Sequence, residues 1–210
     1  MTPHEADGGA VPRPAVSDVK HSTIEQLEAG LDGIRQSPKD AGVLQLIVRR
    51  PRIDAREVLE EAELDLAGGL VGNTWATRGS SRTSRGSAHP DMQLNIMNAR
   101  VIALVAQSSD RWQLAGDQLF IDLDLSADNV PPGTRLALGS AVVEITDQPH
   151  TGCSKFAAHF GTDALKFVNS PVGRELQLRG VNAKVVQPGA IRVGDIGQKI
   201  SAPIAGRAAE

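Results

Sequence analysis

The spacing of hydrophobic residues predicts a helix near the start of the chain. Four apolar residues recur there every three or four positions, namely Ile24, Leu27, Leu31 and Ile34. This spacing places them on one face of a helix. Ser22, with Glu25 three positions later, has the pattern of a capping box at the start of such a helix. We therefore predict an amphipathic helix within residues 21–38, packed on the outside of a domain.

Further along the chain the pattern changes to one typical of strands. Short runs of apolar or alternating residues are separated by glycine and proline. We expect strands at residues 43–48, 58–66, 99–106, 119–125, 135–145, 183–186 and 190–193. The run 99–106 is nearly continuous in apolar residues and has the length of a buried strand. Two short helices are expected at residues 157–168 and 171–178.

These elements predict a fold that is mostly β with short helices, in the α+β class. Many short strands with interspersed short helices favour a closed or nearly closed barrel. We expect the folded domain to span residues 40–200. Residues 1–20 are polar and contain prolines, so we expect a disordered N-terminal arm, and residues 201–210 form a C-terminal tail.

Composition and charge argue against several classes of protein. The net charge is −3 and aromatic residues are only 3% of the 210 residues. Neither a positive field nor stacking platforms for nucleic acid are therefore expected. No stretch approaches the roughly 18–20 apolar residues of a membrane helix, and the N-terminus lacks the pattern of a signal peptide. We expect a cytoplasmic protein that binds neither nucleic acid nor membranes.

The only cysteine of the chain, Cys153, is the best candidate for chemistry. A single thiol cannot form an intramolecular disulfide, and its thiolate is a nucleophile and a soft metal ligand. Pro149 and Gly152 bend the backbone beside it, and His150 and Lys155 can favour the thiolate electrostatically. A buried, inert cysteine is the alternative. The polar neighbours favour a reactive or ligating thiol instead.

Other uses of a cysteine and histidine have less support. A structural zinc site needs four ligands, and the chain has neither a second cysteine nor a paired-histidine spacing. A cysteine protease needs a base, which His89, His150 or His159 could supply, but no family signature surrounds Cys153. Walker, dinucleotide-binding and nucleophile-elbow motifs are absent, which argues against the commonest nucleotide-binding and hydrolase functions.

Arginine residues are concentrated in the polar interval 73–90. Arg78, Arg82 and Arg85 are spaced there by glycine, serine and threonine. Guanidinium groups, hydroxyls and backbone amides together suit a phosphate or a carboxylate. A solvated loop without a ligand has about equal support, although long loops without regular structure are often binding loops or lids.

Several segments together resemble the MOSC family, the domain that ends eukaryotic molybdenum-cofactor sulfurases. They are residues 42–51, 68–73, 115–120, 133–139 and 188–195, together with the segment around Cys153. They occur in the family's order over about residues 40–200, and a stand-alone bacterial type is the closer match. The resemblance implies a compact, β-rich fold with a barrel-like core.

The resemblance also implies a function for the cysteine. The family's essential cysteine maps onto Cys153, where it would carry sulfur as a persulfide or ligate molybdenum in a pterin cofactor. Arg78, Arg82 and Arg85 could then hold the cofactor's phosphate, with Lys155 and His150 beside the thiolate or the pterin. Some family members reduce N-hydroxylated compounds. Pyridoxal phosphate is associated with a desulfurase module fused to some members, and we do not expect it here because nothing marks a Schiff-base lysine.

The chain departs from the family pattern at the cysteine itself. Members generally carry a proline before the cysteine and an arginine a few residues earlier, whereas this chain has Thr151 and Gly152 there. Two hypotheses follow. In the first, Cys153 acts on a molybdenum–pterin cofactor or on its sulfur, with a sulfur donor or redox partner protein. In the second, the chain is a non-catalytic module that binds an anionic small molecule on the arginine loop.

Overall fold

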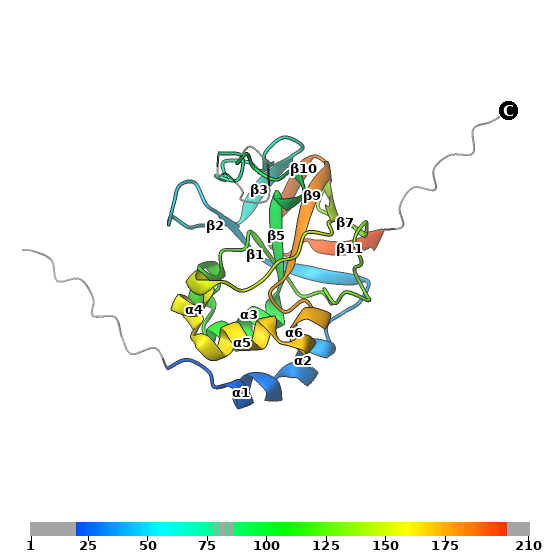
Figure 1. Ribbon diagram of the computed structural model, residues 1–210. Coiled ribbons are helices and arrows are strands. Elements are labelled where there is room, and N and C mark those ends of the chain that lie inside the picture. The colour runs from blue at the N-terminus through cyan, green and yellow to red at the C-terminus, as the bar shows by residue number, and fades with distance from the viewer. Residues whose placement is uncertain (1–19, 78, 80–82, 84–85, 201–210) are drawn as a thin grey trace, which may run out of the picture.

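The protein is a closed barrel of seven strands with short helices at one end (Figure 1). The computed structural model describes residues 20–77, 79, 83 and 86–200. The barrel strands are β1 (Ala41–Arg49), β5 (Leu94–Asn98), β6 (Leu119–Ile121), β7 (Arg135–Leu138), β8 (Ala141–Ile145), β9 (Val181–Gln187) and β11 (Ile196–Ile200). Their order around the barrel is β11-β7-β8-β9-β5-β6-β1, and β1 pairs with β11 to close it. The predicted barrel and α+β class are confirmed.

Four further strands lie outside this ring. β2 (Glu57–Leu59) pairs with the last three residues of β1, beyond the part of β1 that pairs with β11. A separate three-stranded sheet consists of β10 (Gly189–Arg192), β3 (Glu61–Asp65) and β4 (Gly69–Leu70). The predicted strand over residues 58–66 is therefore two strands that belong to two different sheets.

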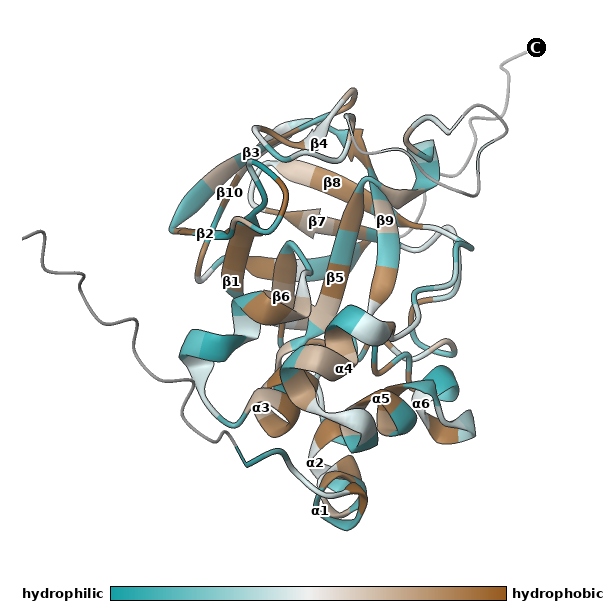
Figure 2. Cartoon of the chain, turned by 60° about the vertical axis from the view of Figure 1, so that its left-hand side comes forward, coloured by the Kyte–Doolittle hydropathy of each residue, from teal (hydrophilic) through white to brown (hydrophobic). Residues whose placement is uncertain are grey.

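The helices are short and gather at one end of the barrel in both views (Figures 1 and 2). The α-helices in the described part of the chain are α1 (Ile24–Ala29), α2 (Leu31–Arg35), α3 (Ala99–Ala106), α4 (Ser154–Phe160), α5 (Thr162–Asn169) and α6 (Pro171–Glu175). Two 3-10 helices, η1 (Pro90–Met92) and η2 (Ser109–Ala115), complete the regular structure there. None of the helices in this part of the chain is long and apolar enough to cross a bilayer.

Two hydrophobic cores result from this arrangement. Residues on alternate positions of the strands, such as Leu94 and Ile96 on β5, fill the barrel. Residues of the opposite strand face, such as Met97 and Phe120, pack with the helices. Strand β6 contributes to both cores and is buried at all three positions. The second core fixes the helices, and so the segments between them, against the barrel wall.

The prediction of a strand over residues 99–106 was wrong, because this run is helix α3. Strands β5 and β6 are parallel, so the chain between them must cross from one end of the sheet to the other. The side chain of Asn98 accepts hydrogen bonds from the backbone N–H groups of Arg100 and Val101 and so caps the helix. A nearly continuous apolar run of eight residues fits a buried helix as well as a buried strand.

Several predicted boundaries also change. The helix over residues 21–38 is interrupted at Gly30, and its capping box consists of Thr23 and Gln26. The helix over residues 157–168 is α4 and α5, separated at Gly161, where φ is +90°. The strand over residues 119–125 ends at Ile121. The strand over residues 135–145 is the hairpin of β7 and β8, and strands β4, β5 and β11 were not predicted from the sequence.

Candidate functional site around Cys153

Cys153 is exposed and stands directly before helix α4, at its N-cap position. Its backbone is extended and its carbonyl oxygen accepts a hydrogen bond from the N–H of Ala157 at 3.1 Å. The thiol itself makes no capping hydrogen bond. The alternative of a buried, inert cysteine is therefore wrong, and the sulfur can be approached from solvent.

The residue before the cysteine is tied to helix α5 by two hydrogen bonds. The N–H of Gly152 donates to Oδ1 of Asn169 at 2.9 Å, and Nδ2 of Asn169 donates to the carbonyl oxygen of Gly152 at 3.1 Å. A Cβ atom at residue 152 would lie 2.8 Å from Leu165 and 3.0 Å from Val168. Glycine thus allows a close approach to α5, and the amide pair fixes the backbone that leads to Cys153.

A buried ion pair lies beneath this segment. The Arg179 guanidinium donates to Asp117 at 2.6 Å and to the carbonyl oxygen of Ala115 at 2.8 Å. The Asp117 side chain is fully buried and that of Arg179 is 7% exposed. Burial raises the pKa of the Asp117 carboxyl, and the neighbouring Arg179 opposes that rise. Such a pair is costly to separate, since either charge alone would remain in the interior.

The ion pair contacts the chain on both sides of Cys153. Nδ1 of His150, three residues before the cysteine, lies 3.6 Å from Oδ1 of Asp117. The Arg179 guanidinium lies over the ring of Phe156, three residues after the cysteine, at 4.9 Å from its centroid. The positions of the loop before Cys153 and of the first turn after it therefore depend on the same two buried charges.

The other basic groups near α4 lie at the surface. The Lys155 ammonium pairs with Asp54 at 3.5 Å, and both side chains are more than three-quarters exposed. His159 lies toward the end of the helix. Partial burial, with the charges of Arg56 and Arg111, lowers the pKa of His159 and favours its neutral imidazole.

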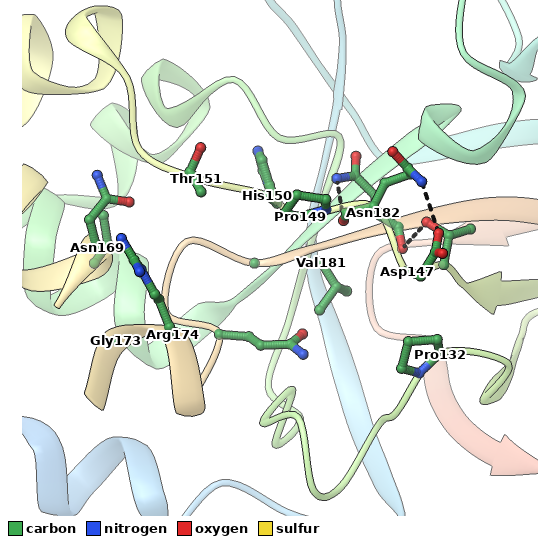
Figure 3. A pocket seen from close by; sticks show the side chains of 15 residues that line it. Pro132, Asp147, Pro149, His150, Thr151, Asn169, Gly173, Arg174, Val181 and Asn182 are labelled. Atoms are coloured by element: carbon green, nitrogen blue, oxygen red, sulfur yellow. Dashed lines mark hydrogen bonds between the residues drawn. The ribbon is translucent and has the colours of Figure 1, made fainter. Parts of the chain in front are cut away.

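A cavity of about 420 Å³ opens next to the cysteine loop (Figure 3). It lies between the chain that follows β8, the ends of α5 and α6, and the start of β9. Its lining residues are Pro132, Thr146, Asp147, Gln148, Pro149, His150, Thr151, Val168, Asn169, Gly173, Arg174, Gln177, Gly180, Val181 and Asn182. His150 belongs to this lining, whereas Cys153 and Lys155 do not.

The fold and the cysteine segment agree with a comparison of the sequence with known families. The family described as MOSC domain matches residues 84–196, which is more than half of the chain and includes Cys153. The chain belongs to the MOSC domain family. The MOSC domain is associated with binding of the molybdenum cofactor.

Solved structures with the same fold are distant in sequence from this MOSC protein. The YuaD protein from Bacillus subtilis is 16% identical, with a TM-score of 0.54 over 77% of this chain and 97% of that one. A hypothetical protein is 20% identical, with a TM-score of 0.52 over 81% of this chain and 72% of that one. Both support a shared fold. No curated protein matches the sequence.

The glycine before the cysteine has a structural reason in this MOSC protein. A proline at residue 152 would lack the N–H that donates to Asn169. Its ring would also meet Leu165 and Val168, which a Cβ atom already approaches within 3.0 Å. In this chain the hydrogen bonds to the Asn169 side chain and the close approach of α5 therefore favour a glycine at residue 152.

The predicted site residues are thus only partly brought together. Cys153, His150 and Lys155 lie on one segment, but His150 turns to Asp117 and Lys155 to Asp54. Arg78, Arg82 and Arg85 lie outside the described residues, so a role for them stays a prediction. Four polar residues that shape the site were not predicted from the sequence, namely Asp117, Asn169, Arg174 and Arg179. Charged residues between apolar neighbours, as in the run from Leu178 to Val181, are the one signal that could have found the ion pair.

Replacing Asn169 with alanine is expected to release the loop before Cys153. Two hydrogen bonds to Gly152 would be lost, which should cost about 1–3 kcal/mol of unfolding free energy. Because Cys153 is the only cysteine, alkylation of the intact protein reports on this thiol alone. We expect the alkylation rate to change by several-fold in Asn169→Ala. Asn129→Ala, which removes an amide side chain elsewhere in the chain, is the control. If Asn169→Ala is alkylated at the wild-type rate, the hydrogen bonds between Asn169 and Gly152 do not position the thiol.

Proposed function

We propose that this MOSC protein uses Cys153 as its point of contact with a molybdenum–pterin cofactor, or with the sulfur delivered to that cofactor. The observation that carries the proposal is the exposed thiol at the start of α4, on a backbone fixed by Asn169. Membership of the MOSC family supplies the class of cofactor. The thiolate supplies either a soft metal ligand or a nucleophile toward sulfur.

The residues around Cys153 fit a cofactor that itself supplies most of the ligands of its metal ion. Within the described ranges, no group of three or more histidine, cysteine or acidic side chains could hold a metal ion. A metal at this position would therefore depend on the Cys153 sulfur and on donors of the cofactor itself. When bound, molybdenum would supply redox chemistry at the thiol. The protein would supply the sulfur, the fixed loop and the cation Lys155 two residues on.

The same thiol can carry sulfur without a metal. The Cys153 thiolate would attack the outer sulfur of a donor's persulfide, and the bond between the two donor sulfurs would break. Cys153 would then hold the persulfide, and the donor would leave as a thiolate. An exposed sulfur is a requirement of this route, because the donor must reach it. Reduction of N-hydroxylated compounds is the corresponding proposal for the molybdenum-loaded form.

Metal and sulfur analysis of the wild type beside Cys153→Ala tests the proposal. The protein would be prepared anaerobically with the molybdenum–pterin cofactor, and separately with a persulfide donor. We expect the wild type to retain one molybdenum atom per chain, or to gain the mass of one sulfur atom. Cys153→Ala should do neither.

Ser154→Ala is the matched control, because it changes the next exposed residue and leaves the thiol in place. It should behave as the wild type. Wild-type protein that acquires neither molybdenum nor a persulfide would refute the proposal, as would Cys153→Ala protein that acquires them equally. Reduction of a hydroxylamine that survives in Cys153→Ser would refute the proposed reductase function of the thiol.

A further inference from the structure

We infer that the cavity beside the cysteine loop binds a small zwitterion, with the anionic end of the ligand at Arg174 and its cationic end at Asp147. This inference goes beyond the role proposed for Cys153, because the thiol does not line the cavity. It rests on two opposite charges among the lining residues, which stand on different sides of the cavity (Figure 3).

Arg174 supplies the anion-binding end. It stands on helix α6, is exposed, and lies near Asn169 in Figure 3. Among the described residues its guanidinium makes neither a hydrogen bond nor an ion pair, unlike those of Arg100, Arg135 and Arg179. A guanidinium in a cavity wall can donate two parallel hydrogen bonds to a carboxylate or a phosphate.

Asp147 supplies the cation-binding end. Figure 3 shows it at the opposite side of the cavity from Arg174. One carboxylate oxygen accepts a hydrogen bond from Gln148 at 2.8 Å, which leaves acceptor capacity on the carboxylate. Asp147 and Arg174 do not pair with each other. Opposite charges held apart across a cavity suit a ligand that carries both charges and spans the space.

The wall between the two ends contains both hydrogen-bonded polar groups and apolar surface. Asn182 is fully buried, donates to the carbonyl oxygen of Gln148 at 3.0 Å and accepts from Asn95 at 2.7 Å. Pro149 and Val181 add apolar surface. The volume of about 420 Å³ lies in the usual range for small-molecule sites. A short aliphatic chain between the charged groups fits this lining.

Calorimetric titration of the full chain at low salt can test the inference with three probes of matched length. ε-Aminocaproate carries both charges, caproate carries only the negative charge, and hexylamine carries only the positive charge. We expect ε-aminocaproate to bind about tenfold more tightly than either of the other two, since each lacks one charged contact. Equal affinities for the three probes, or no binding of ε-aminocaproate, would overturn the inference.

Three variants locate the binding. Arg174→Ala should weaken binding of ε-aminocaproate and of caproate by about tenfold or more, and Asp147→Asn should remove the preference for ε-aminocaproate over caproate. Arg192→Ala, on β10 at the surface, is the control arginine variant and should change nothing. Binding that survives Arg174→Ala would place the ligand elsewhere and refute the site. Cys153→Ala should bind ε-aminocaproate as the wild type does. Absence of ligand binding in the cavity can therefore be distinguished from absence of the proposed chemistry at the thiol.

Discussion

Replacing Arg179 with methionine is expected to lower the free energy of unfolding by about 3–5 kcal/mol at neutral pH. The change leaves the Asp117 carboxylate fully buried without its closest partner. Burial already raises the pKa of Asp117 against the opposing effect of Arg179, so that pKa should rise further in the variant. An acid whose pKa is higher in the folded state than in the unfolded state loses stability as pH rises. The destabilisation should therefore shrink as the pH is lowered toward the ordinary range of an aspartate.

Urea unfolding of wild type and variant at neutral and mildly acidic pH measures this effect. The double variant Asp117→Leu with Arg179→Met serves as the control, because it removes both charges and should recover much of the lost stability. Cys153 alkylation should also become faster in Arg179→Met, since the pair contacts His150 and Phe156 on either side of the cysteine. A double variant less stable than Arg179→Met would contradict this explanation.

Replacing Phe156 with alanine is expected to cost about 3–5 kcal/mol of unfolding free energy. Phe156 is buried and lies against Phe160, with ring centroids 4.9 Å apart. The guanidinium of Arg179 lies over its ring. The first turn of α4 should loosen when this ring is removed, so the Cys153 thiol should be alkylated faster. Phe156→Leu keeps most of the packing and should show smaller changes in both measurements.

Leu94→Ala separates the local effect on the thiol from a general loss of stability. Leu94 is also fully buried, but it stands on strand β5 and fills the barrel, in a different core from the one that packs with the helices. We expect a comparable loss of stability, about 2–5 kcal/mol measured by urea unfolding, with little change in the alkylation rate of the folded protein under native conditions. If Leu94→Ala and Phe156→Ala accelerate alkylation equally, Phe156 has no special role in positioning Cys153.

Part of the barrel was predictable from the sequence, although β5 and β11 were not predicted. In β1, β7, β8 and β9 apolar residues alternate with residues of the outer face, and this spacing is visible in the sequence. Helix α3 could not be distinguished in this way, because its apolar residues are nearly continuous and Asn98 was not recognised as its cap. At Gly30 and Gly161 a Cβ atom would meet Leu104 and His21, and the spacing of residues within a short segment does not reveal such distant neighbours.

Only the features of the candidate site that depend on residues close to Cys153 in the sequence were predictable. The polar neighbours of Cys153 indicated a thiol outside the core, and it is exposed. The contacts that fix it are not local, since Asp117 and Arg179 are 62 positions apart and Gly152 and Asn169 are 17 apart. No spacing rule for a helix or a strand connects residues at such separations. Arg174 was missed for the same reason, because the cavity that it faces exists only after α6 packs beside the cysteine loop.

Closure of the barrel by β1 and β11 has a consequence for how the protein folds. The first barrel strand cannot be paired along its Ala41–Val43 end until Ile196–Gln198 has been synthesised. Contacts between residues so distant in sequence make barrel formation slow compared with folding of helical domains. During synthesis this end of β1 remains an unpaired edge, at which another chain could add. Recruitment of a chaperone to the nascent chain would therefore be most useful shortly before β11 emerges.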